Sequence, residues 1–193
     1  MEITTETLKM LRDKTGVSVM QCKKALEEAN GDIDQAEVIL RKRSGAAADK
    51  KADRELGAGA VATYVHGGEI GAMVLLSCET DFVARNEEFP QLAREIAMQI
   101  AATNPTYLSE TEISEEARAA AEAVFKEEVK DKPADMQEKI LEGKMKSYFK
   151  DQVLLEQAYI KDDSKTIRDL ITEASQKFGE RVEVTRFARF SAR

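Results

Sequence analysis

The sequence predicts an α+β protein with a small antiparallel sheet flanked by helices and a separate three-helix module at its N-terminal end. Helical patterns with capping residues fill residues 1–54, whereas residues 55–193 begin with two β-favouring runs and end with a third. Strands at both ends of a region, with helices between them, are typical of an α+β core. We therefore expect a module with its linker over residues 1–54 and a core over residues 55–193.

Three short helices account for the N-terminal module. The first is predicted from about Thr4 to Lys14 and ends at Thr15-Gly16, while Ser18 and Asp32 are candidate N-caps with a glutamine three positions later, as in a capping box. The Ala- and Lys-rich stretch 41–56 is predicted to be a linker, helical in part. Side chains expected to be buried at helical spacing are Leu8, Leu11, Met20, Ala25, Leu26, Ala29, Ala36, Ile39 and Leu40.

The core is predicted to open with a β-hairpin. Strands Ala60–Val65 and Ile70–Ser77 are joined by His66-Gly67-Gly68-Glu69, and a Gly-Gly pair suits a tight turn because both positions can require positive φ. The later predicted elements are helices at about 89–101, 114–129 and 136–155, an extended piece at 158–160, a capped helix from about Ser164 to Phe178, and a strand at 182–190.

Composition and charge predict a cytoplasmic protein that binds neither membranes nor nucleic acid. The 193 residues contain two cysteines without a CxxC motif, and no apolar run approaches the ~18 residues of a membrane span. The net charge is −7, whereas nucleic-acid binders usually carry a basic surface that neutralises phosphates. The basic cluster Arg41-Lys42-Arg43 could touch RNA, or it could be a solvated helix end.

No pattern of residues predicts an enzyme, a metal site or a cofactor site. The single histidine, His66, has no neighbouring nucleophile with an orienting third group. Two distant cysteines and one histidine do not give metal-ligand spacing. The stretch Gly57–Ala62 matches a dinucleotide-binding pattern formally, but it precedes a strand where that motif should follow one.

The segment Thr80-Asp81-Phe82 admits two interpretations. A large apolar side chain beside a carboxylate, after a strand and before a helix, is a plausible exposed anchor for a partner. The alternative is a buried Phe82, with Asp81 capping the helix that follows. The local pattern by itself favours the alternative.

Several longer motifs resemble a known family. Those that carry the resemblance are Leu11–Gly16, Met20–Glu27, Asn30–Asp32, Cys78–Arg85, Glu142–Met145 and Arg186–Phe190. They are similar, in the same order, to motifs of the bacterial elongation factor Ts family in its short form, and the likeness spans nearly the whole chain. The first three lie in the N-terminal module, and Cys78–Arg85 resembles the signature that precedes the first core helix of that family.

The resemblance implies a translation elongation factor that is not an enzyme but a guanine-nucleotide exchange factor. Such a protein binds elongation factor Tu·GDP, promotes release of GDP and magnesium, and is displaced by GTP. The N-terminal module would be similar to a ubiquitin-associated domain and contact the GTP-binding domain of the partner. The implied partner-binding residues are Arg12, Val19, Met20, His66, Thr80, Asp81, Phe82 and Val83.

The resemblance also implies an oligomeric state. The chain has one hairpin–signature–helix unit where longer family members have two, and short members act as homodimers. We therefore expect a homodimer that forms a two-plus-two complex with elongation factor Tu. Two other functions stay open on the residues alone: a ubiquitin-associated-like adaptor without exchange activity, and a ribosome-associated or RNA-binding protein.

Overall fold

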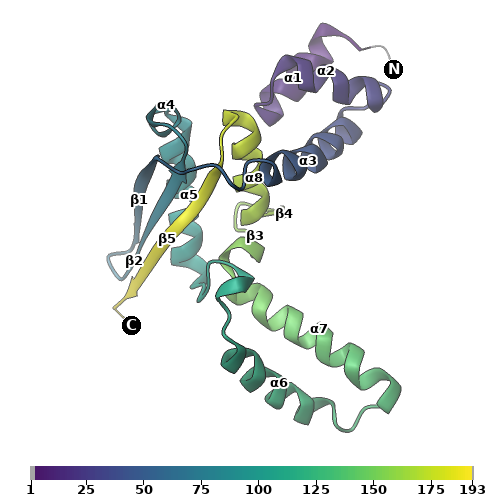
Figure 1. Ribbon diagram of the computed structural model, residues 1–193, viewed down its shortest axis with the longest axis vertical. Helices are drawn as coiled ribbons and strands as arrows, with labels where there is room; N and C mark the ends of the chain where they lie inside the picture. Colours follow the sequence, from purple (N-terminus) through teal and green to yellow (C-terminus); the bar gives the residue numbers. More distant parts are fainter. Residues whose placement is uncertain (1–2, 193) are drawn as a thin grey trace. The chain divides into compact units, whose positions relative to one another are not determined.

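The computed structural model describes residues 3–192 and combines helices with two small sheets (Figure 1). Its elements in chain order are α1 (Thr5–Thr15), α2 (Val19–Glu28), α3 (Ile33–Asp49), β1 (Ala58–His66), β2 (Ile70–Cys78), α4 (Asp81–Ala84), α5 (Glu88–Thr103), η1 (Glu110–Glu112), α6 (Glu115–Val129), α7 (Ala134–Gln152), η2 (Leu154–Glu156), β3 (Ala158–Tyr159), β4 (Asp162–Thr166), α8 (Ile167–Phe178) and β5 (Val182–Ser191). Within the described residues, an antiparallel sheet has the order β1-β2-β5, and β3 pairs with β4 in a second sheet. The predicted α+β class is confirmed.

The chain divides into two compact units. Unit 1 contains the chain up to Ala62 together with residues 75–93 and 168–185, and unit 2 contains residues 63–74, 94–167 and the chain from Arg186 on. Strands β1, β2 and β5 and helix α5 therefore contribute residues to both units. Among residues 3–192, no helix has the length and apolar character needed to cross a membrane.

Helices α1 to α3 of unit 1 pack around a small apolar cluster. Its buried members are Leu11, Val17, Cys22, Ala25, Leu26, Ala29, Ala36 and Leu40. The prediction for Met20 was wrong, because this side chain is 65% exposed. Cys22 is buried there instead, on the same helix face as Leu26. Met20 lies two positions before Cys22, so its side chain points about 200° away from that of Cys22.

Local capping follows the sequence closely. The Thr4 and Thr7 side chains each accept from the other's backbone N–H at 3.1 Å, and Gly16 ends α1 with φ +66°. Asp32 Oδ1 accepts from the Gln35 N–H at 2.9 Å. Only half of the box predicted at Ser18 forms, because the Gln21 side-chain oxygen accepts from Gln176 Nε2 instead.

The first part of the predicted linker continues helix α3 as far as Asp49. Packing against α8 explains its order: the buried Ser44 hydroxyl donates to the Leu40 carbonyl and contacts the Gln176 side chain. Lys51 Nζ then donates to the Ser175 carbonyl at 2.7 Å. The partial helix predicted for this stretch is therefore confirmed, and contacts with α8 add tertiary support that its composition does not reveal.

The predicted start of the helix at Ser164 was wrong. Residues Asp162–Thr166 form strand β4, which pairs with β3, and α8 begins at Ile167. The Ser164 N–H and hydroxyl both donate to Asp162 Oδ1, at 3.2 and 2.6 Å. Serine and aspartate favour such local turns as readily as helix caps, so the residue types alone did not distinguish the two outcomes.

Helices α6 and α7 of unit 2 form a hairpin and lie side by side (Figure 1). Helix α7 ends at Gln152, before the predicted residue 155, because residues 154–156 form a 3₁₀ turn. On α7, Phe149 is buried and packs with Ile113 and Val153. The Tyr148 ring, with its centroid 5.4 Å from that of Phe125, stays partly exposed.

Close approach of β1 and β2 makes Gly59 a sensitive position. A Cβ added there would lie 2.5 Å from the Leu76 carbonyl oxygen, so we expect Gly59→Ala to lower the free energy of unfolding by about 1–3 kcal/mol. Gly143→Ala in α7 is the matched control, because a Cβ added there meets nothing within 4 Å. This variant should raise helix stability by about 0.5–1 kcal/mol. Urea unfolding of both variants checks this, and equal effects would contradict it.

Candidate functional site

The signature segment forms a single helical turn that exposes one side chain and buries the next. Helix α4 starts at Asp81, with Phe82 83% exposed and Val83 4% exposed. The interpretation of Phe82 as a buried residue was therefore wrong. Asp81 is the first helical residue and not the cap, and its carboxylate forms an exposed ion pair with Arg85 at 3.1 Å.

The backbone just before α4 is held by a carboxylate from elsewhere in unit 1. Glu180, between α8 and β5, accepts hydrogen bonds from the N–H groups of Glu79 and Thr80 at 3.1 and 3.0 Å. Its other oxygen accepts the Thr80 hydroxyl at 2.5 Å. Thr80 occupies the N-cap position of α4 but makes no side-chain cap, because its hydroxyl is committed to Glu180.

A second carboxylate makes the reciprocal contact. Glu79 Oε1 accepts from the backbone N–H of Arg181 at 2.5 Å, and the Arg54 guanidinium pairs with the same carboxylate at 3.1 Å. The Arg181 hydrogen bond, followed by the Arg54 contact, lowers the pKa of Glu79 from its usual value, against the raising effect of burial. The contacts are therefore reciprocal: the Glu180 carboxylate binds the backbone of residues 79–80, and the Glu79 carboxylate binds the backbone of residue 181.

The buried Cys78 thiol completes the support of the segment. It donates to the Thr80 carbonyl at 3.2 Å, and burial raises the pKa of this thiol. The other cysteine, Cys22, is also buried with a raised pKa and belongs to the apolar cluster of α1 to α3. Neither is a free surface thiol.

The other predicted site residues lie on two further surfaces. Arg12, Val19 and Met20 are all exposed in unit 1, near the junction of α1 and α2. His66 belongs to unit 2 and is exposed at the hairpin turn, where its Nδ1 lies 3.1 Å from the Tyr64 hydroxyl. Gly67 and Gly68 have φ of +57° and +74°, so the predicted tight turn is confirmed.

Sequence reasoning missed both Glu180 and Arg181. They lie about a hundred residues from the segment that they hold, and no spacing rule relates positions so far apart. The only local signal was Gly179, which ends α8 with φ +75° and so marks a turn at which the next side chains can point back. Sequence reasoning also missed three exposed apolar side chains of unit 2, Val65, Met73 and Phe190.

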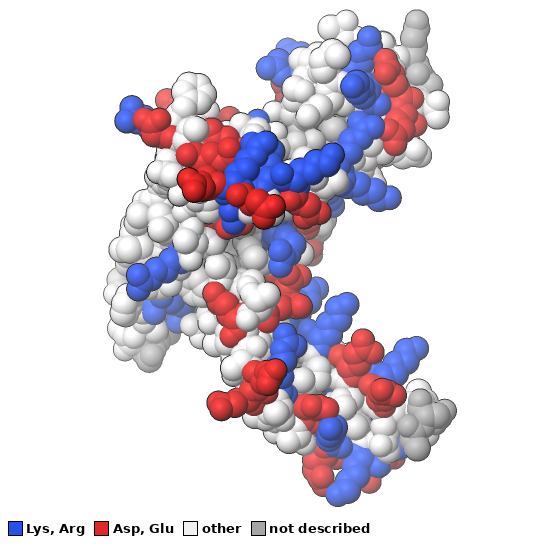
Figure 2. Space-filling model, in the orientation of Figure 1, with Lys and Arg blue, Asp and Glu red and all other residues white. Residues whose placement is uncertain are grey.

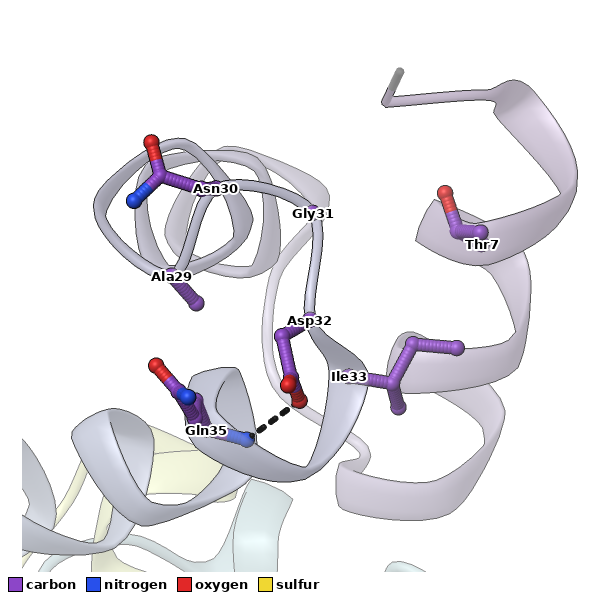
Figure 3. Close-up of a pocket in the computed structure, with 7 residues that line it drawn as sticks. All are labelled: Thr7, Ala29, Asn30, Gly31, Asp32, Ile33 and Gln35. Atoms are coloured by element: carbon purple, nitrogen blue, oxygen red, sulfur yellow. Dashed lines mark hydrogen bonds between the residues drawn. The ribbon is translucent and has the colours of Figure 1, made fainter. Parts of the chain in front are cut away.

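A separate open pocket of about 570 Å³ lies on the N-terminal module (Figure 3). It is lined by Thr7 of α1, the turn Ala29–Asp32, and Ile33 and Gln35 of α3. The Asp32 carboxylate caps α3 through the Gln35 N–H, as the dashed line shows. The pocket contains none of the predicted site residues.

Charged side chains of unit 1 are largely engaged within the protein. In the basic cluster, Arg41 contacts Glu37 and Glu173, and Arg43 pairs with Glu28. Basic side chains gather around the end of α3 beside acidic ones, and the two kinds are interspersed along the α6–α7 hairpin (Figure 2). Among the described residues, no group of three or more His, Cys, Asp or Glu side chains could hold a metal ion.

Fold and site together define a class: an α+β protein that presents a phenylalanine on a braced surface segment. A family model described as Elongation factor TS matches residues 47–193. The chain is 50% identical to elongation factor Ts of Thermodesulfovibrio yellowstonii over 191 residues, covering 98% of this chain and 96% of that protein. It is 50% identical to elongation factor Ts of Leptospira biflexa over 195 residues, covering 98% of each.

A third relative, elongation factor Ts of Thermotoga neapolitana, is 46% identical over 191 residues, 98% of this chain and 97% of that protein. The chain therefore belongs to the elongation factor Ts family, and its role is that of a translation elongation factor. The resemblance inferred from the sequence motifs is confirmed.

The lowered pKa of Glu79 predicts a pH-dependent contribution to stability. A group with a depressed folded-state pKa stabilises the protein fully above its ordinary value, near 4.5, and loses this contribution as the pH falls through the folded-state pKa. Glu79→Gln should thus be less stable than wild type at pH 7, with a difference that shrinks below about pH 4.5. Urea unfolding between pH 3 and 7 measures this.

Glu127→Gln provides the control for that measurement, because Glu127 pairs with Lys130 on the exposed surface of α6. Exposed pairs contribute only about 0–1 kcal/mol, so this variant should stay close to wild type at every pH. A Glu79→Gln difference that is constant between pH 3 and 7 would contradict the assigned role of the carboxylate.

Proposed function

We propose that the protein is a cytoplasmic guanine-nucleotide exchange factor for elongation factor Tu, with no cofactor or reaction of its own. Membership of the elongation factor Ts family supports elongation factor Tu as the partner. One observation carries the mechanism: Phe82 is 83% exposed on a segment whose backbone is fixed by Glu180 and Glu79. A large apolar side chain held in water gains free energy only when a partner buries it.

Exchange follows from differential binding. If the protein binds nucleotide-free elongation factor Tu more tightly than the GDP-bound form, linkage requires that it weakens GDP binding by the same factor. Burial of Phe82, worth about 1.5–3 kcal/mol, supplies this difference if its pocket opens only when the partner changes conformation. Asp81 brings a carboxylate to the same place, where it perturbs the hydrogen bonds and charge around the partner's magnesium site. GTP then displaces the factor through the same coupling.

The remaining site residues provide affinity in this proposal. Residues 1–54 act as a ubiquitin-associated-like module that docks on the GTP-binding domain through Arg12, Val19 and Met20, which the structure exposes. Thr80 and the buried Val83 flank Asp81 and Phe82 and support their pose, and His66 contacts a different domain of the partner. Affinity from these surfaces lets the segment around Phe82 act at low concentration, since contact alone does not shift an equilibrium.

Release of a fluorescent GDP from elongation factor Tu, followed by stopped flow, tests the proposal. Wild type should accelerate release, and Phe82→Ala should reduce the acceleration about 30-fold, the size expected for an interface hot spot of about 2 kcal/mol. Asp81→Ala should reduce it as well. Because Phe82 is exposed, its removal should change the free energy of unfolding by less than about 0.5 kcal/mol.

Val124→Ala is a control, because Val124 is an exposed apolar residue on α6 outside the proposed site. It should leave exchange unchanged. Acceleration that is insensitive to Asp81→Ala and Phe82→Ala would refute the role of the segment. Partner binding lost on removal of residues 1–54, without any acceleration by wild type, would instead identify an adaptor.

We further propose that the protein acts as a homodimer and forms a two-plus-two complex. Val65, Met73 and Phe190 of unit 2 are all at least half exposed on β1, β2 and β5. Apolar side chains exposed together on strands are typical of a surface that another chain covers. A second copy supplies the same surface, as a two-fold interface requires.

Sedimentation equilibrium distinguishes a dimer from a monomer. Wild type should sediment as a dimer, and Val65→Glu combined with Met73→Glu should give a monomer, because burying unpaired carboxylates is costly. Val124→Glu, on the exposed face of α6, should leave the dimer intact. A monomeric wild type would refute the proposal.

A further inference from the structure

We propose that Glu180 is a positioning residue for exchange: its carboxylate sets the pose of the segment that carries Asp81 and Phe82. The inference rests on the proposed function of that segment and adds a residue that acts through the segment. The contacts that carry it are the three hydrogen bonds from Glu79 and Thr80 to one carboxylate.

The segment needs support from outside because it has little of its own. Helix α4 is one turn long, and a single turn is not stable by itself. Its N-cap residue, Thr80, gives the helix no side-chain hydrogen bond. Phe82 points into water and is fixed by no packing, which leaves the buried Val83 and the backbone of residues 79–80 to hold the turn.

Glu180 is itself well anchored on both sides. Gly179 precedes it at the end of α8, with φ +75°. Arg181 follows it and donates its N–H to Glu79 at 2.5 Å. The next residue, Val182, donates its N–H to the buried Ser175 hydroxyl at 3.1 Å. The carboxylate therefore reaches residues 79–80 from a backbone that is fixed at consecutive positions.

Fixing the segment matters because an interface gains affinity when its groups are ordered before binding. Without Glu180, the N–H groups of Glu79 and Thr80 turn to water and the single helical turn samples other poses. Phe82 then has to be ordered at the moment when it enters the partner. Losing the order of the segment should therefore slow GDP release without unfolding the protein.

The chemistry of the contact distinguishes geometry from charge. In Glu180→Gln the amide oxygen can accept from both N–H groups, and the amide NH₂ can donate to the Thr80 hydroxyl, which also acts as an acceptor. Glu180→Asp keeps the charge but is one methylene shorter, so it cannot reach all three donors. If Glu180 positions the segment, Glu180→Gln should exchange like wild type and Glu180→Asp like Glu180→Ala. If only its charge matters, Glu180→Asp should exchange like wild type and Glu180→Gln like Glu180→Ala.

The stopped-flow assay of GDP release is repeated with these three variants of the full-length protein. We expect Glu180→Ala and Glu180→Asp to reduce the acceleration about tenfold, the size expected for losing hydrogen bonds that hold the segment, and Glu180→Gln to stay within about twofold of wild type. Glu112→Ala is the matched control, because the Glu112 carboxylate accepts the Leu108 N–H at 2.6 Å in unit 2, whereas the segment belongs to unit 1. It should leave exchange unchanged.

Amide hydrogen exchange measured by NMR provides a second readout. The amides of Glu79 and Thr80 should lose protection in Glu180→Ala and Glu180→Asp but keep it in Glu180→Gln, with amides of the α1 to α3 cluster unaffected. If wild type itself fails to accelerate GDP release, the proposed function has failed, and these amides alone decide whether Glu180 orders the segment. Acceleration at the wild-type rate in Glu180→Ala, or Asp outperforming Gln, would overturn the proposal.

Discussion

Two glutamates hold the proposed site in place by exchanging hydrogen bonds across a large distance in sequence. Glu180 accepts from the backbone of residues 79 and 80, and Glu79 accepts from the backbone of residue 181. Hydrogen bonds to ionised acceptors are shorter and stronger than neutral ones, and both carboxylates are only partly exposed to competing water. The pose of α4, and with it the exposure of Phe82, depends on this crossed pair.

The same pair is tied to the rest of unit 1 through Ser175 near the end of α8. The Ser175 hydroxyl accepts the Val182 N–H where β5 begins, and its carbonyl accepts Lys51 Nζ just after α3. Partial burial of Lys51 lowers the pKa of its ammonium group. Arg54, three residues later, pairs with Glu79. Residues 51–54, between α3 and β1, therefore help to fix the backbone of the proposed site.

This arrangement suits a protein whose effect depends on one side chain being available to a partner. An exposed phenylalanine on a fixed backbone gains the free energy of apolar burial only when a partner covers it, and the fixed backbone lowers the entropy lost at that step. The opposite design, a phenylalanine on a loose loop, would bind with the same contacts but with weaker coupling to the partner's conformation. Family membership establishes a role in translation elongation, and in the proposed mechanism the braced Phe82 links binding to nucleotide release.

Sequence alone determined the features that depend on residues within one helical turn of each other. Asp32 caps α3, Gly16 and Gly179 end their helices, and Gly67-Gly68 close the hairpin, because capping and positive φ are local properties. It also identified the family through long ordered motifs. Tertiary structure decided the rest: the exposure of Phe82, the packing of residues 41–49 on α8, the strand at 162–166, and the hydrogen bonds from Glu79 and Thr80 to Glu180. Each of these depends on what packs or bonds across the fold, and a local pattern carries no information about a partner a hundred residues away.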